Sequence, residues 1–308
     1  MICRFISSRT TGCDLLVNCV HISVGLCYGA GVLTVDSLRG AAGESVTFTT
    51  SVQPPANPFL ALTWSFNGTI NVITSTSVDV VGQGYENRIT VDKSTGSLVL
   101  RNLTEKDSGE YELLLISQGA EQLHGAAKLE VHTKVTKPTM ACPTENLIEG
   151  KTSVNLTCNA HGFVSTRVWM KDGKPLVPGN GYSFHDGNRV LSISPVSRMD
   201  TGEFLCNVSN DVSFDTTKCA LTVYYGPDKP VIVQRPIEAE LEGSVTLFCS
   251  AHSLPRATFF WRFKHMWMYG SMHYIHQMQE MHLGRYICTA RNAITGLEAS
   301  AFHTLRGI

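Results

Sequence analysis

Asp200-Thr-Gly-Glu-Phe-Leu-Cys206 is the stretch that decides the fold of this chain, because it recurs twice in recognisable form. The first copy is Asp107-Ser-Gly-Glu-Tyr-Glu-Leu113, and the third is His282-Leu-Gly-Arg-Tyr-Ile-Cys288. In a D-x-G-x-Y-x-C run the Gly permits a turn, the Tyr hydroxyl ties a strand to the backbone upstream, and the Cys reaches the opposite sheet. Such a run marks one corner of a β-sandwich of the immunoglobulin kind, so three copies predict three sandwiches.

The spacing of the copies supports this interpretation. Gly109 and Gly202 are 93 residues apart and Gly202 and Gly284 are 82 apart, against about 100 residues for one such domain. We therefore predict an all-β chain, a tandem array of three immunoglobulin-like β-sandwiches, and not one large core.

The composition is that of an ordinary globular protein, with 308 residues, 43% hydrophobic residues and a net charge of −1. It lacks the basic excess that nucleic-acid binding requires, so no nucleic-acid partner is expected. Four of the ten cysteines lie in the first 27 residues, and the other six lie inside the repeats. An even set of cysteines in the repeats indicates an oxidising, extracellular compartment.

Residues 1–30 are typical of a secretory signal peptide: Arg4 and Arg9 precede a mildly apolar run, which small residues follow. The alternative is a truncated signal behind a misassigned start codon. Either way we expect the first four cysteines to be absent from the mature protein. Downstream, no apolar run reaches the roughly 18 residues of a membrane helix, so no anchor is expected within this chain.

The first domain is predicted over residues 31–132. Its tryptophan, Trp64, precedes the corner glycine by 45 residues, against 33 and 23 in the other two domains. Only this interval has room for the extra strands of a variable-type domain. Thr50 and Leu113 stand where the inter-sheet disulfide would be, so we expect a core without one. Arg88 could pair with Asp107 below the corner; the alternative is that both charges are solvated.

The second and third domains are predicted over residues 138–224 and 228–306, as shorter domains of the I or C2 type. The order Cys, Trp, Cys pairs Cys158 with Cys206 and, in the third domain, Cys249 with Cys288. Cys142 and Cys219 lie on the first and last strands of the second domain. Because those strands run side by side, we expect a third disulfide between them. Phe204 replaces the corner Tyr, so the corner hydrogen bond should be missing there.

Methionines and histidines crowd the third domain between Trp261 and Gly284. Thioethers beside imidazoles could bind copper, but no fixed ligand spacing is present and Met often fills gaps in a core. We therefore expect no metal site. The cluster consists of His265, Met266, Met268, Met272, His273, His276, Met278, Met281 and His282.

Four N-x-S/T sequons, each without a central Pro, predict glycans at Asn67, Asn102, Asn155 and Asn207. For catalysis the chain has neither a G-x-S-x-G elbow nor an H-E-x-x-H helix, and its closest approach to a phosphate loop lacks the first Gly. We expect no enzyme activity, no cofactor and no small-molecule substrate.

The corner strand of the first domain directs apolar side chains outward. Strict alternation from the inward Leu113 leaves Glu112, Leu114 and Ile116 on the outer face. Such residues form a contact surface on an adhesion protein; the alternative is that a neighbouring strand or loop covers them.

The chain resembles the carcinoembryonic-antigen-related cell adhesion molecules over about residues 32–305. The resemblance rests on a variable-type first domain without its disulfide, on two shorter disulfide-bonded domains, and on the junction Tyr225-Gly-Pro-Asp228. The stretches Cys249-Ser-Ala-His-Ser-Leu-Pro-Arg-Ala and Thr289-Ala-Arg-Asn-Ala-Ile-Thr-Gly296 add to it. The first two domains are also similar to the hepatocyte and glial cell adhesion molecules, through Trp169-Met-Lys-Asp-Gly-Lys-Pro-Leu176.

The resemblance implies a cell-surface adhesion or recognition ectodomain. It implies that one sheet of the first domain binds a like or related immunoglobulin domain, or a microbial adhesin. By position, the implied face contains Ser65, Glu112, Leu114, Ile116 and Gln118. A glycan on Asn67 would border this face. The alternative is a soluble secreted binding protein, such as a decoy or immune modulator.

Overall fold

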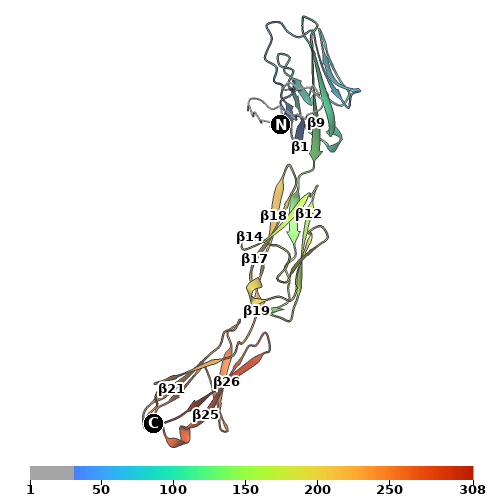
Figure 1. The fold of residues 1–308 in the computed structure, drawn as a ribbon. Coiled ribbons are helices and arrows are strands. Elements are labelled where there is room, and N and C mark those ends of the chain that lie inside the picture. The colour runs from blue at the N-terminus through green and yellow to red at the C-terminus, as the bar shows by residue number, and fades with distance from the viewer. Residues whose placement is uncertain (1–30, 308) are drawn as a thin grey trace, which may run out of the picture. The chain divides into compact units, whose positions relative to one another are not determined.

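The computed structural model describes residues 31–307, and it consists of strands with three short 3₁₀ helices (Figure 1). The predicted signal peptide, residues 1–30, lies outside the described residues. The chain divides into two compact units, with the boundary between Lys134 and Val135. Among the described residues, no helix has the length and apolar character needed to cross a membrane.

The first unit is a sandwich of a six-stranded and a three-stranded sheet. The larger sheet has the order β1-β9-β8-β3-β4-β5, and β1 runs parallel to β9 beside it (Figure 1). Its strands are β1 (Ser37–Ala41), β3 (Ala61–Phe66), β4 (Ile70–Ser75), β5 (Asp79–Val81), β8 (Gly109–Ile116) and β9 (Gln122–His132). The smaller sheet, β2-β7-β6, consists of β2 (Val46–Phe48), β6 (Ile89–Val91) and β7 (Leu98–Leu100). Helix η1 (Glu105–Asp107) precedes β8.

The extra strands β4 and β5 occupy the long interval after Trp64, which confirms the variable-type pattern of this sandwich. Among the described residues, the core of this sandwich contains no cysteine. Thr50 stands at the usual cysteine position and its hydroxyl donates to the carbonyl of Thr95 at 2.7 Å. Leu113, at the other position, is buried. The indole of Trp64 is also buried and donates to the carbonyl of Gly96 at 2.9 Å. Apolar packing and these two bonds hold the centre together.

The second unit contains two further sandwiches, each with its own hydrophobic core. The first of them has the sheets β10-β12-β16-β15 and β14-β13-β17-β18, with a short parallel pair β11-β19. Its elements are β10 (Thr136–Met140), β11 (Leu147–Ile148), β12 (Val154–His161), β13 (Thr166–Lys171), β14 (Lys174–Pro175), β15 (Tyr182–His185), β16 (Val190–Ile193), η2 (Arg198–Asp200), β17 (Gly202–Ser209), β18 (Phe214–Leu221) and β19 (Val223–Tyr224).

The last sandwich has the sheets β20-β21-β24 and β23-β22-β25-β26. Its elements are β20 (Val231–Arg235), β21 (Val245–Ser250), β22 (Thr258–Phe263), β23 (Met266–Tyr269), β24 (Met272–Ile275), η3 (Glu280–His282), β25 (Gly284–Arg291) and β26 (Glu298–Leu305). The short interval between Trp261 and Gly284 leaves room for two brief strands and one turn of helix. The all-β array of three sandwiches predicted from the three corner sequences is confirmed.

Candidate functional site

The outer face of the six-stranded sheet in the first unit brings together most of the predicted binding residues. Leu114 pairs with Thr63 of β3 and with His124 of β9. Glu112 pairs with Ser65 on one side and with Ala126 on the other. Ile116 lies one row further along β8 and, like Leu114 and Glu112, is half-buried. Because all of these positions have the same strand parity, they share one face.

Gln118 lies at the end of this face and not within it. It follows β8, is exposed, and its amide donates to the carbonyl of Pro58 at 3.1 Å. That bond ties together the two loops that close this end of the sheet.

The structure adds residues of β5 that sequence reasoning missed. Val80 pairs with Thr74, and Thr74 pairs with Thr63, so one row crosses five strands from Val80 through Leu114 to His124. Val80 is 58% exposed, more than the half-buried Leu114. In the sequence, Val80 belongs to the mostly apolar stretch Val78-Asp-Val-Val81. Without a regular alternation of apolar and polar residues, this stretch does not predict which side chains point outward.

Polar groups lie within this row and beside it. Thr74 donates its hydroxyl to the side-chain oxygen of Asn71 at 2.9 Å, and the Asn71 amide donates to the carbonyl of Val80 at 3.1 Å. Glu110 and Glu112 point outward from β8, and neither forms an ion pair with another described residue. The face is therefore mixed: Val80, Leu114 and Ile116 are apolar, and threonines, a histidine and two carboxylates lie between and beside them.

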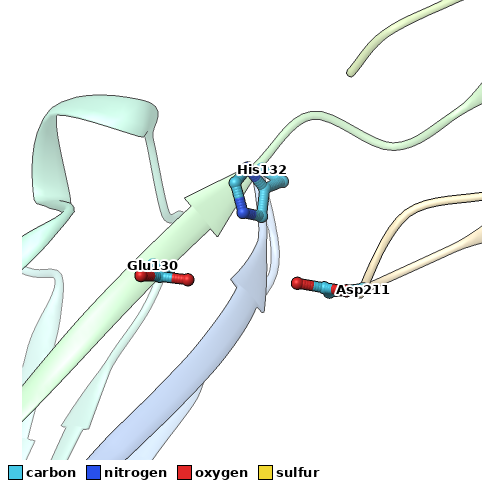
Figure 2. A group of neighbouring side chains, drawn as sticks. All are labelled: Glu130, His132 and Asp211. Atoms are coloured by element: carbon cyan, nitrogen blue, oxygen red, sulfur yellow. The ribbon is translucent and has the colours of Figure 1, made fainter. Parts of the chain in front are cut away.

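Further along the same sheet, β9 ends in alternating outward side chains, Glu130 and His132 (Figure 2). The ammonium of Lys128 bonds Glu130 at 2.8 Å and lowers the pKa of that carboxyl. Asp211, the third residue labelled in Figure 2, belongs to the turn between β17 and β18 in the second unit. Within either unit of the described chain, no three His, Cys, Asp or Glu side chains bring ligand atoms within 4.8 Å of one another.

Below the face, Arg88 and Asp107 are joined at the corner. The two guanidinium NH₂ groups reach the two carboxylate oxygens at 3.2 and 2.6 Å, and Arg88 also donates to the carbonyls of Gly84, Arg101 and Asn102. Burial pushes the pKa of Asp107 up, but the hydrogen bonds from Arg88 and Thr104 outweigh burial and leave it below its usual value. The pair is structural and nearly buried, so it fixes the start of β8.

In two of the sandwiches a corner tyrosine fastens the equivalent strand, β8 in the first and β25 in the last, to the backbone that precedes it. Tyr111 donates its hydroxyl to the carbonyl of Asp107, and Tyr286 donates to that of His282, both at 3.0 Å. Phe204 cannot do this, but Tyr182 of β15 donates to a carboxylate oxygen of Asp200 at 2.5 Å. A hydroxyl from another strand thus fastens this corner through the Asp200 carboxylate, and not through the backbone carbonyl that Tyr111 and Tyr286 bond. The local sequence does not reveal this contact.

Three disulfides lie in the second unit of the structure, and all six predicted cysteines take part. Cys158 is bonded to Cys206 and Cys249 to Cys288, each across its sandwich, with Cα atoms 6.4 and 6.5 Å apart. Cys142 is bonded to Cys219, with Cα atoms 5.6 Å apart.

The four sequons lie in different settings. Asn67 and Asn102 are exposed at positive φ of 51° and 50°, as turn residues often are. The side-chain oxygen of Asn67 accepts the amide of Glu110 at 2.9 Å, at the end of the outer face. Asn155 is exposed on β12. Asn207 is half-buried on β17, and its buried side-chain oxygen has no partner among the described residues.

The methionine and histidine cluster is partly core and partly surface. Met278 is fully buried and fills the core, whereas Met266, Met272 and Met281 are exposed. A pocket of about 450 Å³ lies between β23, β24 and β25, and His273 and His282 are among its lining residues. Burial, with the nearby His282, lowers the pKa of His273.

Comparison with known proteins found matches both to domain models and to solved structures. Residues 36–112 and residues 137–210 each match an immunoglobulin domain model. Murine CEACAM1b is similar in structure at 24% identity, covering 62% of this chain and 97% of that chain, with a TM-score of 0.51.

Two solved structures match over a longer part of the chain. The full ectodomain of mouse nectin-like molecule 4 (Ig1–Ig3) is 18% identical, with 88% of this chain and 96% of that chain covered and a TM-score of 0.54. A structure of Dpr2 Ig1–Ig2 in complex with DIP-Theta Ig1–Ig3 is also 18% identical, with 88% and 97% covered and a TM-score of 0.53. At this identity they show the fold. The chain is a tandem array of immunoglobulin-like β-sandwiches, two segments of which match the immunoglobulin domain family.

Proposed function

We propose that this chain is an extracellular adhesion or recognition ectodomain that binds a like or related immunoglobulin domain through the outer face of its first unit. The observation that carries the proposal is the row from Val80 through Leu114 to His124. It places Leu114 on the central strand β8 and Val80 on the edge strand β5, with threonines between them and a histidine beyond Leu114. Apolar centres with polar rims are the usual anatomy of protein interfaces.

We expect a single contact between two such faces to be weak. Leu114 and Ile116 are already half-buried by their neighbours, so a partner removes little further apolar area from water. Many weak contacts formed at once between apposed membranes reach useful avidity. We therefore propose a role at the cell surface, with a like domain as the first partner and a microbial adhesin as a heterophilic one.

We also propose the division into three domains, residues 31–132, 138–224 and 228–306, behind a signal peptide at 1–30. Glycans on Asn67, Asn102, Asn155 and Asn207 belong to this proposal. Asn67 lies at the end of the outer face, where its amide nitrogen is free of the bond to Glu110. A glycan there would limit the width of partner that the face accepts.

Bead clustering tests the proposed face. Beads coated with the wild-type chain should cluster, and Leu114→Asp should reduce clustering by at least about fivefold, because a central interface residue contributes more than about 1 kcal/mol. The matched control is Thr47→Asp, the same charge on an exposed position of the opposite sheet. Circular dichroism verifies each fold. If folded Leu114→Asp beads cluster like the wild type, the proposed face is wrong.

A further inference from the structure

A second outer face carries the largest exposed aromatic side chains of its sandwich. On the sheet β23-β22-β25-β26, Trp261, Tyr286 and Cys288 point into the core, so the alternate residues point out. Trp267 is 55% exposed and Phe302 is 62% exposed. They end one cross-strand row, Trp267–Arg262–Ile287–Phe302. Tyr269, 86% exposed, lies in the next row.

Arginine side chains lie over these rings. The guanidinium carbon of Arg285 is 3.9 Å from the ring centroid of Phe302, and that of Arg262 is 5.9 Å from the ring of Trp267. Neither arginine has a carboxylate partner among residues 31–307. Trp, Tyr and Arg are the residue types that dominate the binding energy of protein interfaces.

The corresponding sheet of the neighbouring sandwich is built differently. Two of its outward rows are Val168–Asn207–Thr216 and Met170–Leu205–Lys218, with a sequon in the centre, and the row Thr166–Ser209–Phe214 ends in a phenylalanine that is 75% exposed. The aromatic side chain of this sheet thus lies at its edge, and the centre carries the sequon. No N-x-S/T sequon occurs after Asn207 in the sequence. The aromatic face is therefore free of N-linked glycan and open to a protein.

Charge indicates what would cover it. Residues 229–308 contain eight Lys and Arg against five Asp and Glu, whereas residues 31–134 contain seven against eleven. The outer face of the first unit presents Glu110 and Glu112, neither of which forms an ion pair with another described residue; Lys128 stands opposite Glu110 in the register and bonds Glu130. Two residues along a strand separate the α-carbons of Glu110 and Glu112 by about 7 Å. Arg262 pairs with Ile287, so Arg285 is its diagonal neighbour, at about 7–8 Å.

We propose that the aromatic face of the last sandwich docks a second copy of this chain, through the acidic outer face of that copy's first unit. Arg262 and Arg285 would meet Glu110 and Glu112, while Trp267 and Phe302 would cover apolar residues such as Leu114. The contact is heterologous, since two different surfaces meet. This inference rests on the proposed function of the first unit, and it names the surface that completes the pair.

Charge reversal in the full chain tests the pairing. Beads carrying Arg262→Glu with Arg285→Glu should cluster at least about fivefold less than wild type, and so should beads carrying Glu110→Arg with Glu112→Arg. Mixing the two kinds should restore clustering, because each supplies the charge that the other lacks. Clustering of wild-type beads should also weaken as salt rises, since exposed charges are screened. Arg256→Glu, an exposed arginine outside the face, is the control.

The outcomes separate this inference from the proposed function. If the arginine double variant clusters like wild type while Leu114→Asp does not, the first face acts without the aromatic face and the inference is wrong. It is equally wrong if wild-type beads do not cluster at all, or if mixing restores nothing. Loss of heparin binding in the arginine variant with unchanged clustering would make the face a glycan site and not a protein contact. Tyr269→Ser, which changes no charge, should reduce clustering if the face is covered.

Discussion

Arg198 of η2 donates hydrogen bonds to both carboxylate oxygens of Asp228 at 2.8 Å each. The same guanidinium bonds Glu149 at 2.7 to 3.0 Å and lies 4.1 Å from the ring centroid of Tyr225. Tyr225 and Asp228 belong to the segment that leads from β19 to β20. One arginine thus fastens this segment to the sandwich that precedes it.

The other end of the segment is fastened as well. Asn292 is fully buried and its amide donates to the carbonyl of Tyr225 at 3.0 Å, while Thr295 donates to that of Gly226 at 2.7 Å. The segment between β19 and β20 is therefore held by side chains at both ends.

Arg198→Ala should loosen this segment. We expect limited proteolysis between residues 224 and 230 to become several-fold faster at neutral pH, because cleavage follows the population of locally open states. Arg189→Ala, which removes an exposed ion pair with Asp186, is the control and should leave the rate unchanged. Equal rates in wild type and Arg198→Ala would show that the clamp does not hold the segment.

Acid should have the same effect on the wild-type segment. Hydrogen bonds from Arg198 lower the pKa of both Asp228 and Glu149 below their ordinary values of 3.8 and 4.5. A lowered pKa stabilises the folded state above the ordinary value, and that stability is lost as pH falls through the lowered one. Proteolysis with an acid-active protease should therefore accelerate below about pH 4 in the wild type, and less so in Arg198→Ala.

Arg88→Ala should destabilise the first unit by about 3 kcal/mol, since it leaves the nearly buried Asp107 without its partner. Scanning calorimetry of the whole chain would show the unit's transition at a lower temperature. Lys93→Ala removes an exposed pair with Asp79 and should shift it little. If the transition temperature shifts no more in Arg88→Ala than in Lys93→Ala, the Arg88–Asp107 pair contributes no more than a solvated pair.

A reducing agent should affect the melting transitions of the two units differently. The three disulfides among residues 31–307 lie in the second unit, and each native bridge in a small domain typically contributes about 2 to 5 kcal/mol. A reducing agent should lower the melting transitions of the second unit and leave that of the first unchanged. A first-unit transition that moves with reductant would contradict the disulfide-free core.

Tyr182→Phe should cost the second unit about 1 to 2 kcal/mol, because Asp200 loses a buried hydrogen bond. Tyr269→Phe, on a side chain that is almost fully exposed, should be nearly neutral. Chemical denaturation monitored by circular dichroism measures both. If Tyr182→Phe is as stable as Tyr269→Phe, the hydrogen bond from Tyr182 to Asp200 does not stabilise the second unit.

The sequence alone determined the number and type of the sandwiches. Tryptophans, corner residues and cysteines point inward through the local alternation of a strand, which needs no knowledge of its neighbours. The interval after Trp64 likewise set the variable type, since extra strands require chain length. Leu114 and Ile116 could be assigned to the outer face for the same reason.

Only the tertiary structure decided which residues from distant segments meet. Val80 joins the row of Leu114 through the register of three strand pairs, and Trp267 joins that of Phe302 through another three. Tyr182 reaches Asp200, and Arg198 reaches Asp228, from separate elements. Register and such side-chain contacts arise when sheets pair and pack, and a one-residue slip would move every outward side chain to the other face. The local periodicity of the sequence does not predict which register the strands adopt.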